Sequence, residues 1–188
     1  MTLEPVYSGQ YGMPVSEDGS KIFVGFWEKA YEGEKRGLQA YDIESDSLLW
    51  RLNEGKIRNL FVYSDYLIAT QADASVLKVD INTGEILGQV RSGAIERSFD
   101  LGYPYIMVDS IGNKLGVVDV EKMEVVKKYD KYRSKILNPS NCRSLVIQSA
   151  QLQDNILTVS GFEGSPPGRY DLDDEPFSRV IDPNFSDF

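Results

Sequence analysis

Carboxylates are the side chains that could support chemistry in this sequence, because it contains no histidine and a single cysteine, Cys142. The lack of histidine excludes a Ser-His-Asp or Cys-His catalytic set and a histidine-ligated metal. One cysteine cannot form an internal disulfide or a cysteine-ligated zinc site. A pair of carboxylates could cleave a glycosidic bond without histidine, yet no two of them stand out as a pair. We therefore expect no catalytic residue, no metal and no cofactor.

An acidic and aromatic set of side chains is the candidate binding site. Segments 28–37 and 162–168 are longer than the corresponding segments 71–75 and 110–113 of two similar repeats. Binding residues concentrate on such loops above a rigid scaffold, and aromatic residues with acidic neighbours suit a basic partner. The alternative is a solvated loop with incidental charges. The predicted partner-binding residues are Trp27, Glu28, Tyr31, Glu32, Glu34, Glu54, Phe162 and Glu163.

Two other charged segments carry weaker signals. Segment 171–175 clusters acidic residues, but Pro176 follows where a calcium loop needs glycine and further ligands, so we expect a solvated turn. Segment 130–135, preceded by Lys127 and Lys128, is the main basic patch, and its six residues of mixed charge predict a solvated connector. No glycine-rich phosphate-binding motif occurs.

The overall charge and hydropathy limit the kind of partner. The chain has 188 residues and a formal net charge of −9, from 20 Lys and Arg against 29 Asp and Glu. This balance argues against direct nucleic-acid binding, which needs local positive charge. Apolar runs of about six residues are far shorter than the roughly 20 residues of a membrane helix. The first twelve residues lack the pattern of a signal peptide. We expect a cytoplasmic protein without membrane contact.

A repeat organises the elements that must position these residues. Stretches 38–52, 76–90, 115–129 and 167–181 each contain an aspartate between apolar residues. The four aspartates are Asp42, Asp80, Asp119 and Asp171. An aspartate can accept backbone N–H bonds from residues just ahead of it, so each is predicted to start a tight turn. Recurrence favours this structural role over four equivalent catalytic or metal-binding carboxylates. Gly84 is predicted to take a positive φ in its hairpin turn.

Short β-branched and aromatic segments precede each repeat and predict further strands. They are 21–27, 65–71, 104–110 and 155–161, with candidate innermost strands at 6–11, 59–62, 98–101 and 143–149. β-type units at a period near 40 residues are typical of propellers. The predicted fold is all-β: a small propeller-like ring of about four four-stranded antiparallel blades. The single domain 1–188 would contain blades at 6–52, 57–90, 97–129 and 143–182. An open arc, or a larger ring completed by a second chain, is the alternative.

Two repeats carry a family resemblance. The stretches YDIESDSLLW (41–50) and VDINTGEILG (79–88) resemble the blade ends of WD40-like and quinoprotein-like propeller repeats. The resemblance implies the fold and no cofactor, because no quinone-binding set is present.

These features together predict a non-catalytic protein-binding domain that is a monomer or a heterodimer with a basic partner. The most specific hypothesis is the immunity protein of a bacterial toxin–immunity pair of the contact-dependent inhibition type. It would neutralise a basic nuclease toxin by covering the active site. A small-ligand-binding or carbohydrate-active propeller and a scaffold subunit are the alternatives.

Overall fold

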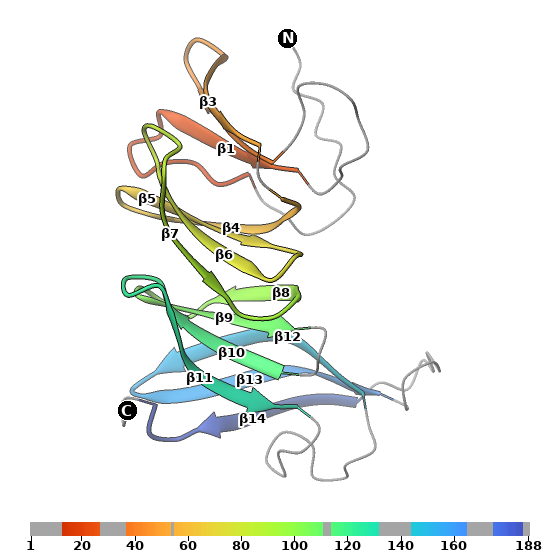
Figure 1. Cartoon of the computed structure of the whole chain (residues 1–188). Helices are drawn as coiled ribbons and strands as arrows, with labels where there is room; N and C mark the ends of the chain where they lie inside the picture. Colours follow the sequence, from red (N-terminus) through yellow and green to blue (C-terminus); the bar gives the residue numbers. More distant parts are fainter. Residues whose placement is uncertain are drawn as a thin grey trace. The chain divides into compact units, whose positions relative to one another are not determined.

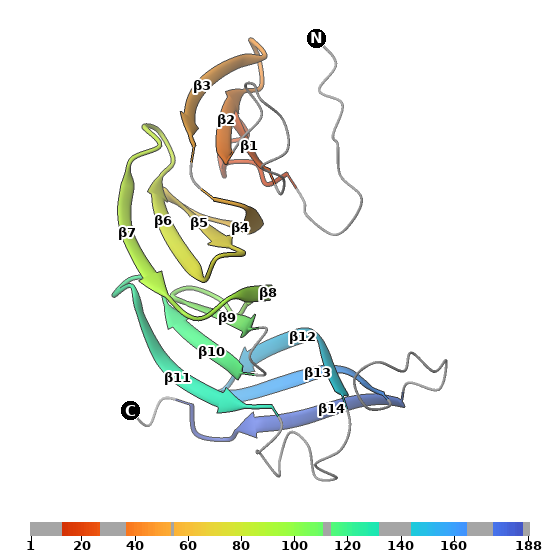
Figure 2. The same ribbon diagram turned by 45° about the vertical axis from the view of Figure 1, so that its right-hand side comes forward.

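The computed structural model of the chain consists of β-strands joined by turns (Figures 1 and 2). The structure describes residues 13–26, 37–53, 55–110, 114–131, 144–164 and 175–185. Within these ranges no helix is long and apolar enough to span a membrane. The chain divides into two compact units, Met1–Ser98 and Phe99–Phe188, with the boundary inside strand β8.

The first unit contains two antiparallel sheets. Sheet 1 has the order β1 (Lys21–Gly25), β2 (Leu38–Asp42) and β3 (Ser47–Leu52). Sheet 2 has the order β4 (Ile57–Tyr63), β5 (Tyr66–Gln71), β6 (Ser75–Asp80) and β7 (Ile86–Arg91). The predicted strand 6–11 lies outside the described residues, and an isolated bridge joins Val15 to Ile22 on β1.

The remaining strands form two more antiparallel sheets. Sheet 3 contains β8 (Ile95–Asp100), β9 (Tyr105–Ser110), β10 (Lys114–Asp119) and β11 (Glu124–Asp130). Sheet 4 contains β12 (Ser144–Gln153), β13 (Ile156–Gly164) and β14 (Glu175–Asp182). The prediction of an all-β fold with four antiparallel sheets is confirmed. In the described ranges, two of these sheets have four strands and two have three. Closure of the four sheets into a ring stays a prediction.

Each unit has its own hydrophobic core. Phe23, Leu67 and Leu77 belong to the core of the first unit, and Leu115 and Ile147 to that of the second. Strands β5 and β9 are buried along almost their whole length, on both faces. This burial explains the nearly continuous apolar character of both segments, since a strand covered on two faces needs no polar alternation.

The repeated aspartates fold the turns as predicted. Oδ1 of Asp42 accepts the N–H of Ser45 at 2.7 Å, and Oδ1 of Asp80 accepts the N–H groups of Asn82 and Thr83 at 2.8 Å each. Oδ1 of Asp119 makes two equivalent bonds of 3.0 Å. Gly84 has φ 75°. The turn interpretation is therefore confirmed for these three aspartates.

The alignment of the fourth repeat was wrong. Strand β14 pairs directly with β13, from Glu163↔Glu175 to Leu157↔Asp182, so it takes the third position in its sheet. The fourth turn aspartate is therefore Asp182, whose Oδ1 accepts the N–H of Asn184 at 3.1 Å. Asp171 lies outside the described residues.

A proline concealed the correct alignment. Pro183 follows Asp182 where the other repeats have an apolar residue. Proline has no N–H to donate, and the N–H of Phe185 bonds instead to the carbonyl of Asn155 at 2.8 Å. In sheet 2 the corresponding bond runs from the N–H of Ile81 to the carbonyl of Asp65 at 3.1 Å.

Candidate functional site

In sheets 2 and 3, tight turns join the first strand to the second and the third to the fourth at one end, which we call the turn end. The second strand connects to the third at the opposite end, which we call the loop end. In sheet 1, turn 16–20 before β1 and turn 43–46 between β2 and β3 lie at the turn end. The turn end of the first unit consists of 16–20, 43–46, 64–65 and 81–85. All of these turns are short, so their side chains lie close to the ends of the strands.

Carboxylates gather at the turn end of the first unit. They are Glu17, Asp18, Asp42, Glu44, Asp46, Asp65, Asp80 and Glu85, all exposed or half-exposed. Lys21 and Lys78 are the basic residues on the strands that meet these turns, and Nζ of Lys78 lies 3.9 Å from the ring centre of Tyr66. Arg51, Lys56, Arg58 and Arg91 lie toward the loop end. The first unit therefore presents negative charge at one end of its sheets.

Hydrogen bonds hold several of these carboxylates in the ionised state. The Ser16 hydroxyl, followed by the backbone N–H of Ser20, lowers the pKa of Asp18. The Ser45 hydroxyl and N–H lower the pKa of Asp42 in the same way. The N–H groups of Thr83 and Asn82 lower the pKa of Asp80. Donors that bond to a carboxylate stabilise its charged form, so these side chains stay charged at pH values where an ordinary aspartate takes up a proton.

Direct contacts hold the turns of sheets 1 and 2 side by side. Glu17 Oε1 accepts the N–H of Ser64 at 3.1 Å, and the Trp50 indole N–H donates to the carbonyl of Ile81 at 3.1 Å. The Trp50 ring also packs against Gly84, where an added Cβ would come within 2.7 Å of the ring. These contacts fix the acidic turns of sheet 1 next to those of sheet 2.

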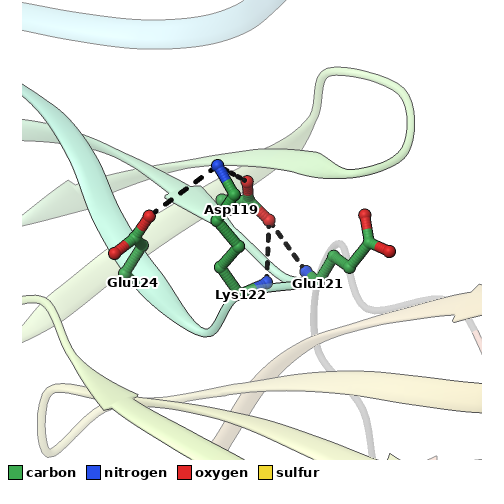
Figure 3. A network of polar contacts seen from close by, with 4 residues as sticks. All are labelled: Asp119, Glu121, Lys122 and Glu124. Carbon is green, nitrogen blue, oxygen red and sulfur yellow. Dashed lines mark hydrogen bonds and ion pairs between the residues drawn. The ribbon is translucent and has the colours of Figure 1, made fainter. Parts of the chain in front are cut away.

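The turn end of sheet 3 has a different charge balance (Figure 3). Nζ of Lys122 lies 3.4 Å from Oδ2 of Asp119 and 3.9 Å from Oε1 of Glu124. This turn therefore contains its own cation. Turns 43–46 and 81–85 of the first unit contain no lysine or arginine.

An ionic contact joins sheets 3 and 4. Nζ of Lys127 and the Tyr129 hydroxyl, both on β11, donate to Oδ2 of Asp182 at 2.8 and 2.7 Å. Partial burial raises the pKa of Asp182, but the bonds from Lys127 and Tyr129 outweigh it and lower the pKa overall. Burial, then the bond to Asp182, raises the pKa of the Tyr129 hydroxyl, so it remains a donor.

Two of the predicted partner-binding residues lie in the described ranges. Phe162 and Glu163 are in strand β13, which runs to Gly164, and not in the predicted loop. Phe162 is half-buried, while Glu163 is buried and paired with Arg179. Neighbouring strand residues point to opposite faces, so the structure does not bring these two side chains together.

The other predicted residues, namely Trp27, Glu28, Tyr31, Glu32, Glu34 and Glu54, lie outside the described residues. The loop-end site as a whole therefore stays a prediction. No group of three or more acidic or cysteine side chains could hold a metal ion in the ranges that the structure describes. Most of the acidic segment 171–175 falls outside these ranges.

The acidic turn end was missed by the sequence reasoning. Its carboxylates were interpreted as turn formers, which the hydrogen bonds confirm for Asp42 and Asp80. A usable signal was present, because turns 16–20, 43–46 and 81–85 all carry acidic residues beyond those that cap the turn. The sequence reasoning did not use the fact that the hairpin topology places all of these turns at the same end of the sheets.

Comparisons with known proteins identify the fold. No protein-family model and no curated protein matches this chain. BamB from Moraxella catarrhalis is 14% identical with a TM-score of 0.54, covering 82% of this chain and 43% of BamB. The computationally designed Ika8 protein is 16% identical with a TM-score of 0.56, covering 86% and 43%. A chain of a mitotic checkpoint complex is 14% identical with a TM-score of 0.58, covering 79% and 43%.

These similarities support the propeller-like fold that the repeats predicted. This chain spans less than half the length of each similar structure.

Proposed function

We propose that this chain is a non-catalytic protein-binding domain whose partner is a basic protein. The observation that carries the proposal is the acidic turn end of the first unit, where hydrogen bonds fix the carboxylates of Asp18, Asp42 and Asp80 and lower their pKa. Complementary charge accelerates encounter and selects among partners. The same charge repels nucleic-acid phosphates and anionic lipid surfaces. One structurally similar chain comes from a mitotic checkpoint complex, which supports an assembly role for the fold.

The most specific form of the proposal is a cytoplasmic immunity protein that binds a bacterial nuclease toxin as a heterodimer. A nuclease must hold a polyanion, so its active site is basic, and an acidic inhibitor can cover it. The net charge of −9 supports this form.

A scaffold subunit of a larger assembly is a second candidate. It is favoured by the length comparison, since the similar structures are more than twice as long as the part that this chain matches. Light scattering of the purified chain tests it: a mass well above 21.2 kDa supports an assembly, and a monomeric mass contradicts self-assembly.

The proposal is tested by affinity capture from the lysate of the source organism, at about 50 and 500 mM NaCl. We expect a basic protein that is captured at low salt and weakened at high salt, because salt screens exposed charges. Its affinity is then measured with purified proteins. The absence of a saturable basic partner at either salt concentration would reject the proposal.

Charge reversal then locates the surface. We expect Glu44→Lys/Glu85→Lys at the turn end to weaken binding about tenfold or more. The matched variant Glu28→Lys/Glu32→Lys, which makes the same change in net charge, should change it by less than about twofold. The opposite result would support the loop-end prediction and reject the turn end as the contact surface.

A further inference from the structure

Two pairs of consecutive apolar residues are exposed on the outer strands of the first unit. Leu48 and Leu49 on β3 are 44% and 43% exposed, and Ile86 and Leu87 on β7 are 38% and 50% exposed. Successive residues of a regular strand face opposite sides of the sheet. Two large apolar neighbours that both reach solvent therefore need either solvent on both faces of the strand or a local irregularity.

A β-bulge at the same position in both sheets supplies this irregularity. In sheet 1, Ala40 pairs with Trp50 and Tyr41 with Leu48, which leaves Leu49 as the extra residue. In sheet 2, Lys78 pairs with Gly88 and Val79 with Ile86, and Leu87 is the extra residue. A bulge locally bends and twists the strand and redirects side chains.

Sheet 3 shows that the bulge does not require exposed leucines. Its pairing shifts between Val117 and Val118 in the same way, which leaves Val126 as the extra residue of β11. Val125 and Val126 are both half-buried, and Val126 packs against the core of the second unit. Large exposed side chains at these positions are therefore a property of the first unit and not of the fold.

Both apolar pairs lie near one contact between sheets 1 and 2. Trp50, two residues beyond Leu48, packs on Gly84, two residues before Ile86. Two residues of a strand span about 7 Å, so both pairs lie close to this contact. Carboxylates of the adjoining turns border them. Leu48, Leu49, Ile86 and Leu87, with Glu44, Asp46 and Glu85, are named here the apolar–acidic surface.

We propose that the apolar–acidic surface binds an amphipathic, basic helix of a partner protein. Apolar side chains spaced along one face of such a helix would cover the two exposed pairs, and flanking lysines or arginines would meet the carboxylates. Exposed apolar patches with a polar rim mark interaction sites, and the sign of this rim selects a basic partner. The inference rests on the proposed function, because it names the segment by which the basic partner is held.

A synthetic pair of peptides tests the surface directly. The probe is a fluorescently labelled leucine–lysine peptide of about 14 residues whose leucines form one helical face. Its control has the same composition with the leucines spread around the helix. We expect the wild-type chain to bind the amphipathic peptide about tenfold more tightly than the control peptide, measured by fluorescence anisotropy.

Matched variants assign the binding to the named residues. Leu49→Ser/Leu87→Ser should remove the preference for the amphipathic peptide, while Val180→Ser, at an apolar residue that is 45% exposed on β14, should keep it. Glu44→Lys/Glu85→Lys should weaken binding, whereas Glu121→Lys/Glu124→Lys in the turn of sheet 3 should not. All the substituted leucines are exposed, so the variants should fold, and circular dichroism checks this.

Two results would overturn the inference: equal binding of the two peptides, or wild-type binding by Leu49→Ser/Leu87→Ser. The natural partner separates this inference from the proposed function. A captured basic partner that binds Leu49→Ser/Leu87→Ser as well as it binds the wild type would leave the function standing and reject the surface. If the peptide binds with the expected variant pattern but no basic partner is captured, the surface stands as a peptide-binding site and the proposed function is rejected.

Discussion

Asp109 and Lys131 form an almost fully enclosed ion pair in the second unit. Nζ of Lys131 lies 2.5 Å from Oδ1 of Asp109, and their side chains are 7% and 3% exposed. Asp109 is on β9, and Lys131 directly follows β11. A buried charge is costly unless it is paired, so neither residue can be lost alone without penalty.

We expect Lys131→Met to lower the free energy of unfolding by about 3–5 kcal/mol, because it leaves the Asp109 carboxylate buried without this cation. The double variant Asp109→Leu/Lys131→Met should lose less than either single variant, since no buried charge remains. Urea unfolding of the three variants measures this, with Lys128→Met, at an exposed lysine, as the control. A Lys131→Met variant as stable as that control would contradict the structural role of the pair.

The sequence could not predict these partners. Segment 130–135 was interpreted as a solvated connector, yet Lys131 within it is buried with Asp109. Lys127, just before this segment, is bonded to Asp182. The partners are separated by 22 and 55 positions along the chain. Local periodicity assigns a residue to a face, but a charge partner in another strand depends on tertiary packing.

At the scale of elements, strand positions were predictable because their signal is local. Segment 65–71 became β5 and segment 104–110 became β9, each within one residue. The fourth repeat was misaligned, because Asp171 fits the apolar-Asp-apolar pattern, whereas Pro183 interrupts this pattern after Asp182. Pairing with β13 decides the register, and pairing is a non-local property.

The candidate site was less predictable than the fold. Loop length directed attention to Glu28, Glu32 and Glu34, which lie outside the described residues. The exposed leucines Leu49 and Leu87 depend on a bulge that appears in the strand pairing. From sequence alone, one of two adjacent apolar residues in a strand is expected to be buried.

The contact of Trp50 with Gly84 links sheets 1 and 2. We expect Gly84→Ala to lower the free energy of unfolding by about 2 kcal/mol or more, because it adds a clash with Trp50 to the strain of a positive φ. Gly19→Ala is the matched control: its φ is 71° against 75° for Gly84, but an added Cβ would meet nothing within 4 Å. If urea unfolding shows the same loss of unfolding free energy for the two variants, the clash with Trp50 does not contribute to the destabilisation.

Asp182 joins the last turn to β11 and should make this link sensitive to acid. Its pKa is lowered in the folded chain, so its stabilising contribution is complete above the unfolded value of about 3.9 and is lost as the pH falls through the lower folded value. We expect Asp182→Asn to cost about 1.5–3 kcal/mol at pH 7, because the bonds to a charged acceptor are weakened.

The stability gap between the wild type and Asp182→Asn should then narrow below about pH 4, where the Asp182 carboxylate takes up a proton in the unfolded chain but stays charged in the folded one. It should close once the pH is below the lowered pKa of the folded carboxylate. Thermal unfolding of both proteins between pH 2 and 7 measures this gap. A gap that stays constant over this range would mean that the charge of Asp182 does not stabilise the fold.

At the scale of the whole molecule, residues 1–188 were predicted to form a single domain. The structure divides the chain into two compact units, each with its own core. Strand β8 belongs to both units along the chain, because Ser98 ends the first and Phe99 begins the second. A strand cannot keep its hydrogen-bond ladder when half of it unfolds. This continuity favours one cooperative unfolding transition.

We expect Leu67→Ala, in the first core, and Leu115→Ala, in the second, to lower the midpoint of one shared transition. Both leucines are fully buried, so each substitution should cost about 2–5 kcal/mol, or about 2–4 °C of Tm per kcal/mol at this chain length. Leu87→Ala, at an exposed residue, is the control. Calorimetry measures the midpoint and compares the calorimetric with the van't Hoff enthalpy. Two transitions, each moved by the substitution in one core alone, would instead make each unit a domain.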